Sequence, residues 1–168
     1  MIVIADSSPL RYLIVIEQVH LLPLLYGRIV IPSSVERELT RTATPQPVVT
    51  WMEHLPGWVT VKSPQNPQTA LASILGLGER EAIALAEELA ADVLLVDDEA
   101  ARVEAVRRNI PVQGTLGLLD LAAEHGLLAD LPGTIQRLQS TNFRASKKLY
   151  AFLLERDALR KKRGARGS

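Results

Sequence analysis

Carboxylate side chains follow two hydrophobic runs of this chain and begin a helix-like segment between them. Asp6 comes directly after MIVIA, and Asp97 and Asp98 come directly after DVLLV. Glu79 and Glu81 stand at the start of GEREAIALA. Uninterrupted Val, Ile and Leu runs are typical of parallel strands buried on both faces, whose carboxyl ends form the sheet edge where ligands bind. Carboxylates gathered there repel one another unless a cation joins them, so the pattern predicts a site for a hard divalent ion with oxygen ligands.

Each aspartate also has a purely structural interpretation. Asp6 precedes Ser-Ser-Pro and can act as the N-cap of the next helix, and one of Asp97 and Asp98 can do the same for the helix that follows them. Two adjacent aspartates in a partly buried crevice are costly unless they are paired or bound to a metal, which favours the ligand interpretation. Thr115, after the last predicted strand, is expected chiefly to cap a helix, with a place in the same crevice as the alternative.

The glutamates are harder to assign, because they occur in two pairs whose members lie on different faces of the same predicted helix. Glu36 and Glu38 in SSVEREL point to different sides, so only one can reach a shared site, and periodicity does not choose between them. In GEREAIALA, Glu81 is the better candidate to point inward, since it lies one turn before the apolar Leu85. Glu79 is interpreted as a first-turn residue that stabilises the helix dipole.

The elements that must position these residues alternate between strand and helix. The predicted strands are Ile2–Ala5, Arg28–Ile31, Trp58–Val61, Val93–Val96 and Pro111–Gln113. The predicted helices are Pro9–Ile16, Val19–Tyr26, Ser33 or Ser34 to Arg41, Val48–Leu55, Glu79–Ala90, Glu99–Arg108, Thr115–His125, Leu131–Ser140 and Ala145–Lys162. This alternation predicts an α/β fold, a three-layer α/β/α sandwich around a five-strand parallel sheet. Ser63–Thr69 is expected to be the loosest internal stretch.

Composition narrows the classes of function. The 168 residues suit one domain, predicted over residues 1–150 and followed over 151–168 by a helix end and a frayed basic tail. The formal net charge is zero, so a nucleic-acid partner needs a local basic patch. The absence of cysteine excludes disulfides, thiolate nucleophiles and zinc–thiolate sites, and it fits a cytoplasmic protein. No stretch is long and apolar enough to span a membrane, and the apolar start is interpreted as a strand rather than a signal peptide.

Other motifs point to no second chemistry. The three histidines are isolated, and there is neither a G-x-S-x-G elbow nor a P-loop. The Gly76-Leu77-Gly78 segment lacks the lysine and strand context of phosphate-binding loops, and no cofactor is predicted for it. A receiver-like domain would need a lysine at the end of the last strand, where Gln113, Gly114 and Thr115 stand instead.

Several stretches together resemble the PIN domain, and most closely its DUF3368 subgroup of short prokaryotic proteins. The resemblance runs from Met1 to about Tyr150 and rests on the joint order of IADSSPLRYL, LYGRIVIPSSVEREL, LGLGEREAIALAEEL, LLVDDEAAR and VQGTLGLLDLAAEHGLL. It implies a ribonuclease that depends on Mg²⁺ or Mn²⁺, often the VapC-like toxin of a type II toxin–antitoxin pair. By motif position Asp6, Glu38 and Glu81 match the first three acids, and Asp97 or Asp98 matches the fourth.

This resemblance sets the expected site and partners. The expected catalytic residues are Asp6, Glu38, Glu81, Asp97 and Asp98, and the expected metal ligands are the same set without Glu38. The chain departs from the commoner family pattern with Glu81 where many members have aspartate, and with adjacent aspartates at the end of the fourth strand. The expected partners are RNA, a cognate antitoxin and a second copy of the chain. A non-catalytic PIN-like module that binds protein or RNA is the alternative.

Surface features could serve these partners, although each also has a structural interpretation. Arg11, Arg80 and Arg102 are candidates to bind substrate, and the basic C-terminal tail could contact RNA phosphates or only be solvated. Trp51 and Trp58 could stack on bases, but packing is the favoured interpretation. Apolar residues of the first helices form either a partner surface or the core: Leu10, Leu13, Leu21 and Leu24.

Overall fold

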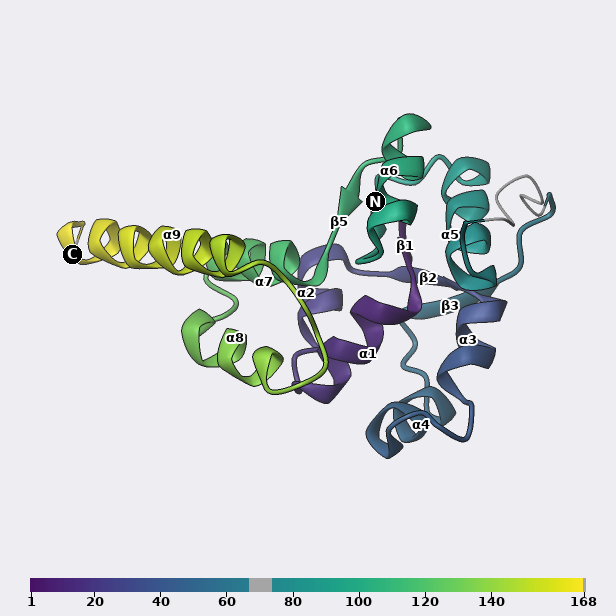
Figure 1. Ribbon diagram of the computed structural model, residues 1–168, viewed down its shortest axis with the longest axis horizontal. Helices are drawn as coiled ribbons and strands as arrows, with labels where there is room; N and C mark the ends of the chain where they lie inside the picture. The colour runs from purple at the N-terminus through teal and green to yellow at the C-terminus, as the bar shows by residue number, and fades with distance from the viewer. Residues whose placement is uncertain (67–73, 168) are drawn as a thin grey trace. The chain divides into compact units, whose positions relative to one another are not determined.

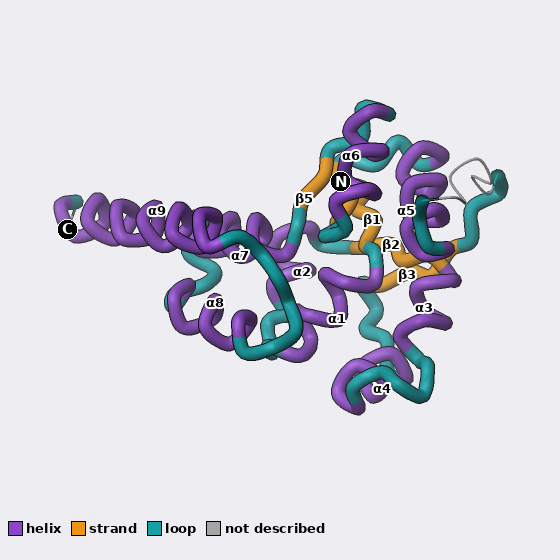
Figure 2. The backbone as a smooth tube through the Cα atoms, viewed as in Figure 1, coloured by secondary structure: helices purple, strands orange, loops and turns teal. Residues whose placement is uncertain are grey.

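A computed structural model describes residues 1–66 and 74–167 of the chain. Within these residues the chain forms two compact units, residues 1–115 and residue 116 onward. Figures 1 and 2 show their helices and strands. The boundary between the two units lies at the start of a helix, whereas the sequence predicted a domain limit at residue 150. The predicted limit stays a prediction. Part of the expected loose stretch, residues 67–69, lies outside the described residues.

Five parallel strands form one sheet within the described part of the first unit, in the order β3-β2-β1-β4-β5. The strands are β1 (Val3–Ala5), β2 (Ile29–Pro32), β3 (Val59–Lys62), β4 (Val93–Leu95) and β5 (Val112–Gln113). Ile4 of β1 pairs with Val30 of β2 on one side and with Leu94 of β4 on the other. Because β1 is central and all strands are parallel, the chain leaves β1 and β4 at the same edge of the sheet.

Helices cover both faces of this sheet, which confirms the predicted three-layer α/β/α fold. The helices of the first unit are α1 (Ser7–Val15), α2 (Leu21–Tyr26), α3 (Ser33–Leu39), α4 (Gln46–Glu53), α5 (Leu77–Glu88) and α6 (Glu99–Arg107). In Figure 1, α5 and α6 lie on one side of the strands, and α1 and α4 lie on the other. Each parallel connection passes through at least one helix, as βαβ units require.

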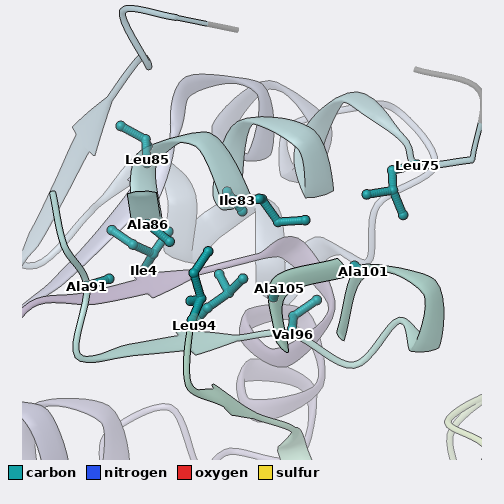
Figure 3. Close-up of a cluster of buried hydrophobic side chains, with 12 residues drawn as sticks. Ile4, Leu75, Ile83, Leu85, Ala86, Ala91, Leu94, Val96, Ala101 and Ala105 are labelled. Carbon is teal, nitrogen blue, oxygen red and sulfur yellow. The ribbon is translucent and has the colours of Figure 1, made fainter. Parts of the chain in front are cut away.

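The core between the sheet, α5 and α6 explains why these segments fold together. Ile4 and Leu94 are fully buried at the sheet, and Ile83 is fully buried on α5. Figure 3 shows this apolar cluster, whose labelled members are Ile4, Leu75, Ile83, Leu85, Ala86, Ala91, Leu94, Val96, Ala101 and Ala105. Burial of each large aliphatic side chain stabilises the fold by about 1.5–3 kcal/mol. The packing fixes the first turn of α5 relative to the ends of β1 and β4.

The second unit is helical, with most of α7 (Thr115–Glu124), then α8 (Leu131–Gln139) and α9 (Lys147–Arg166). Asp130 caps α8 by accepting the Gly133 N–H at 3.0 Å, and Ser146 caps α9 by accepting the Leu149 N–H at 3.1 Å. None of the described helices is both long and apolar enough to pass through a bilayer.

The helix predicted over Ala145–Lys162 extends further in the structure, into the basic segment that was expected to fray. Helix α9 continues to Arg166. The Lys161 ammonium lies 2.8 Å from the buried Asp157 carboxylate, so the predicted point of fraying is anchored. Positive side chains also favour the negative end of the helix dipole, where Arg163 and Arg166 stand in the last turn.

Candidate active site

The ends of β1 and β4 bring Asp6 and Asp97 to one edge of the sheet. The Asp6 N–H donates a hydrogen bond to the Leu95 carbonyl oxygen at 2.9 Å, which ties the two strand ends together. Asp6 itself is only 2% exposed. It occupies the N-cap position of α1, but within the described part of the chain its side chain makes no cap hydrogen bond. The capping interpretation therefore does not account for this carboxylate.

Asp6 is held in surroundings that oppose its negative charge. Burial is the largest of the effects that together raise the pKa of Asp6 from 3.8 to about 7. Hydrogen bonding with the Ser7 backbone lowers the pKa, whereas the negative charges of Glu79, Glu38 and Asp97 raise it further. Among the described residues, Asp6 Oδ1 has no hydrogen-bond partner. A buried carboxylate oxygen without a partner, next to other acids, is stabilised by a bound cation.

Gly78 marks the point where two of the acids meet. A Cβ atom added to Gly78 would lie 3.2 Å from Glu38 Oε2 and 3.3 Å from Asp6 Oδ1. The two carboxylate oxygens therefore face the same small space, which glycine leaves open. Helical periodicity did not choose between Glu36 and Glu38, the family resemblance matched Glu38, and in the structure the Glu38 carboxylate lies beside Gly78 with that of Asp6.

Asp97 and Asp98 have different surroundings. Asp97 accepts hydrogen bonds from the Thr115 N–H at 2.8 Å and from the Thr115 hydroxyl at 2.7 Å. Burial raises the pKa of Asp97, while the Thr115 hydrogen bonds and the charge of Arg102 lower it. Asp98 is exposed and caps α6 by accepting the Ala101 N–H at 2.9 Å. One of the two aspartates is thus a cap, and Thr115 shares the crevice with the other.

Glu79 and Glu81 also separate in the structure. Glu81 Oε2 accepts the Ser34 N–H at 3.1 Å, at the beginning of α3. Glu79 lies in the first turn of α5, as its sequence position indicated. Burial raises the pKa of Glu79, its hydrogen bonds to the backbone of Glu79 and Gly76 lower it, and the charges of Asp98 and Glu38 raise it. Asp6, Glu38, Glu79 and Asp97 thus form an acidic cluster in which the other three charges act on Asp6. Glu81 is instead hydrogen-bonded to the backbone of α3.

A cavity of about 240 Å³ opens beside the acids and adds positive charge to the site. Its lining residues are Ser34, Arg37, Glu38, Arg41, Gly76, Leu77, Gly78 and Glu79. Arg37 and Arg41 are exposed and lie one turn apart on the α3 side of the cavity. Neither arginine was predicted to bind substrate and no role was predicted for the glycines, although the spacing of Arg37 and Arg41 on either side of Glu38 is a usable signal.

The other candidate residues lie in different environments. A Cβ atom on Gly114 would lie 3.0 Å from Arg102 Nη1 and 3.2 Å from Asp97 Oδ1, so Arg102 lies beside the acid. Trp51 and Trp58 pack against each other with ring centroids 5.8 Å apart, in agreement with the favoured packing interpretation. Of the four leucines considered for a partner surface, three belong to the core and only the last is exposed: Leu10, Leu13, Leu21 and Leu24.

The carboxylates of the site fit an ion such as Mg²⁺, which keeps several water ligands, better than an ion that takes all its ligands from the protein. Among residues 1–66 and 74–167, no three His, Cys, Asp or Glu side chains converge closely enough to hold an ion together. Asp6 and Glu38 do face one space, and Mg²⁺ is commonly held by one or two carboxylates while it keeps several waters. The partnerless Asp6 oxygen is a suitable hard ligand for such an ion.

Comparison with known families agrees with the fold. The family model described as DUF3368: PIN domain matches residues 2–158. The matched region includes every acid of the cluster and both arginines of the cavity. No curated protein matches the chain.

Proposed function

Because the chain belongs to the DUF3368 family of PIN domains, we propose that it is an endoribonuclease that requires Mg²⁺ or Mn²⁺. PIN domains are generally nucleases, and they generally use divalent metal ions. The observation that carries the proposal for this chain is the convergence of Asp6 and Glu38 on Gly78. There, a buried oxygen of Asp6 has no hydrogen-bond partner among the described residues.

The side chains at the site divide into those that hold a cation and those that bind the substrate. Asp6 and Glu38 would hold the ion, with Asp97 nearby and fixed in orientation by Thr115. A bound divalent ion supplies Lewis-acid chemistry, lowering the pKa of water and neutralising charge on the phosphate and leaving oxygen. Arg37 and Arg41 can bind a phosphate of the RNA strand next to these acids. No side chain of the site needs to act as a covalent nucleophile.

The proposal extends to a biological role. A VapC-like toxin would be inhibited by a cognate antitoxin, and a homodimer is the expected assembly. Co-expression with the product of a small neighbouring reading frame tests the toxin role. Growth arrest by this protein alone, relieved by that product, is the expected result.

One observation favours the non-catalytic alternative. No three carboxylates among the described residues meet around one point. A binding module whose acids serve only the structure would not need them to meet. Metal titration separates the two functions, because an ion that binds only the folded state raises its stability by about 2.7 kcal/mol at 100 times its Kd. A nuclease should show a rise in Tm with Mn²⁺, and a module without a metal site should show none.

Cleavage of RNA by the purified protein tests the function directly. Labelled single-stranded RNA should be cut in the presence of Mn²⁺ or Mg²⁺, and addition of EDTA should stop the reaction because the acids alone cannot activate water. Restoring the metal in excess over EDTA should restore cleavage. Cleavage that continues unchanged in EDTA would contradict the proposed metal dependence.

Substitution of Gly78 by alanine tests whether the space between Asp6 and Glu38 is used. The added methyl group would lie within 3.3 Å of both carboxylate oxygens, so we expect Mn²⁺-dependent stabilisation to be lost and cleavage to fall at least about tenfold. The helix preference of alanine over glycine, at most about 1 kcal/mol, opposes the cost of these close contacts, so we expect only a small change in the free energy of unfolding without metal. Gly164→Ala in α9 is the matched control, since nothing lies within 4 Å of its added Cβ. Full Mn²⁺ stabilisation in Gly78→Ala would remove this pair as ligands.

A further inference from the structure

The second unit contains a larger cavity that the proposed active site does not use. It has a volume of about 550 Å³ and is lined by Glu124, Phe152, Arg156, Leu159, Arg160 and Arg163. All but Glu124 belong to α9, and their spacing places them on one face of that helix. The volume lies in the range of about 300–1,000 Å³ that is usual for ligand pockets.

Positive charge is concentrated in this unit. Residues 116–168 contain 10 Lys and Arg against 5 Asp and Glu, whereas residues 1–115 contain 9 against 14. The formal charge of zero for the whole chain therefore conceals an excess of five positive charges in the unit that carries the cavity. A concentrated basic surface attracts nucleic acid even when the complete protein is neutral.

Buried acids hold part of the guanidinium cluster in place. Arg160 lies 2.7 Å from Asp120 and 3.0 Å from Asp157, and both carboxylates are buried. Arg156 also reaches Asp120, at 3.3 Å. These ion pairs largely neutralise Arg156 and Arg160, but they fix the geometry of the cavity wall. Arg163 makes no ion pair with any residue that the structure describes, so its charge is available to a ligand.

An exposed aromatic ring lies in the same cavity. Phe152 is 53% exposed, and the Arg156 guanidinium lies 5.7 Å from the centre of its ring. Aromatic rings and guanidinium planes are the surfaces on which proteins stack unpaired RNA bases. A nucleotide carries both a flat base and a phosphate, whereas an acidic peptide would match only the charge. The combination of Phe152 with Arg163 therefore favours a nucleotide.

We infer that this cavity is a second contact site for single-stranded RNA, with a base against Phe152 and a phosphate on Arg163. The inference rests on the proposed function only in taking RNA as the ligand. It adds a site remote in sequence from the acidic cluster, whose contribution is to affinity rather than to bond cleavage. Two linked contacts on one strand raise its overall affinity without any change at the first contact.

The test measures RNA binding separately from cleavage. The full-length protein in EDTA is titrated against a fluorescein-labelled single-stranded RNA of about 20 nucleotides, and anisotropy is recorded at several salt concentrations. Arg163→Glu should weaken binding at least about tenfold and reduce the salt dependence by roughly one phosphate contact. Lys162→Glu is the matched control, since it changes the same charge one residue earlier on α9 and outside the cavity lining. It should weaken binding less than about threefold.

The aromatic contact has its own pair of variants. Phe152→Ala should weaken binding about tenfold because a stacked base is lost, and Leu154→Ala, another exposed apolar residue of α9, should leave binding unchanged. Helical circular dichroism and Tm are compared for all four variants. Equal losses for Arg163→Glu and Lys162→Glu would overturn the site in favour of non-specific attraction. Displacement of the RNA by poly-glutamate at equal charge would overturn it in favour of an acidic polypeptide.

These binding experiments distinguish a failure of the second RNA contact from a failure of the proposed nuclease function. Arg163-dependent RNA binding in EDTA without any cleavage in Mn²⁺ would support the second contact and contradict the nuclease. Cleavage in Mn²⁺ combined with binding that none of these variants weakens would support the nuclease and overturn the second contact.

Discussion

Replacing Asp6 by asparagine is expected to reduce metal-dependent RNA cleavage by about 10³-fold or more and to stabilise the metal-free fold above neutral pH. Activity falls because the amide cannot supply the negative charge that a divalent ion needs. Stability rises because the buried position opposes that charge, as the elevated pKa of about 7 indicates. The Asp6→Asn variant thus separates what the residue contributes to function from what it costs the fold.

The raised pKa of Asp6 determines how the free energy of unfolding changes with pH. The pKa of Asp6 is about 7 in the folded chain, against 3.8 when unperturbed, so the folded state binds more protons between these values. Stability of the wild-type protein therefore falls as the pH rises from about 4 to about 7, by up to about 4 kcal/mol, and the loss is complete above that range. Asp6→Asn lacks this contribution, so its advantage should be small near pH 4 and largest above pH 7.

Chemical denaturation without metal at about pH 5 and about pH 8 measures this difference, and cleavage assays with Mn²⁺ measure the activity. Added Mn²⁺ should raise the Tm of the wild type and not that of Asp6→Asn. A variant that cleaves RNA normally would show that the site lies elsewhere. A stability difference that does not grow with pH would contradict the buried, charge-opposing environment of Asp6.

The second large effect distinguishes two glutamates on the same helix. Glu79→Gln is expected to reduce cleavage about 100-fold, because Glu79 lines the cavity beside Glu38 and its carboxylate adds to the negative charge that attracts a divalent ion. Glu81→Gln should leave most of the cleavage activity and cost about 1 kcal/mol of stability, because it weakens the hydrogen bond from Ser34 at the beginning of α3.

Each variant is the control for the other, because both replace a carboxylate by an amide of the same shape on α5. Cleavage rates at saturating Mn²⁺ and free energies of unfolding are measured for both. The opposite ranking, with Glu81→Gln inactive and Glu79→Gln active, would support the assignment made by motif position. In that case Glu81 would have to leave Ser34 when metal and RNA bind.

The sequence contained enough to locate the strand-end acids. Asp6 and Asp97 follow hydrophobic runs whose length and composition identify buried parallel strands, and parallel strands end at one edge of the sheet. The end of α2 was equally readable, since Gly27 adopts a φ of +76° that other residues avoid. These predictions succeeded because each depends on local pattern or local stereochemistry.

The choice between neighbouring acids depends on tertiary packing and could not be made in the same way. Helical periodicity favoured Glu81 as the inward residue because of Leu85, but it does not say which side of the helix meets the strand ends, and Glu81 instead accepts the Ser34 N–H. The role of Gly78 was also invisible, because it follows from the approach of Asp6 and Glu38, which come from other elements. The continuation of α9 past the predicted end was also missed, because composition alone suggested a solvated end, whereas the structure pairs Lys161 with the buried Asp157 one turn earlier.

The opposite charge excesses of the two units have a consequence for the behaviour of the protein in solution. At its isoelectric point near 6.8 the molecule has no net repulsion from its neighbours, yet each copy offers both a basic and an acidic segment to them. Mutual attraction is then strongest in dilute buffer, and at 0.1 M salt mobile ions largely screen it at separations greater than about 10 Å. Moderate salt should therefore dissolve the protein better than pure water, which is the salting-in behaviour of proteins that attract one another through opposite charges.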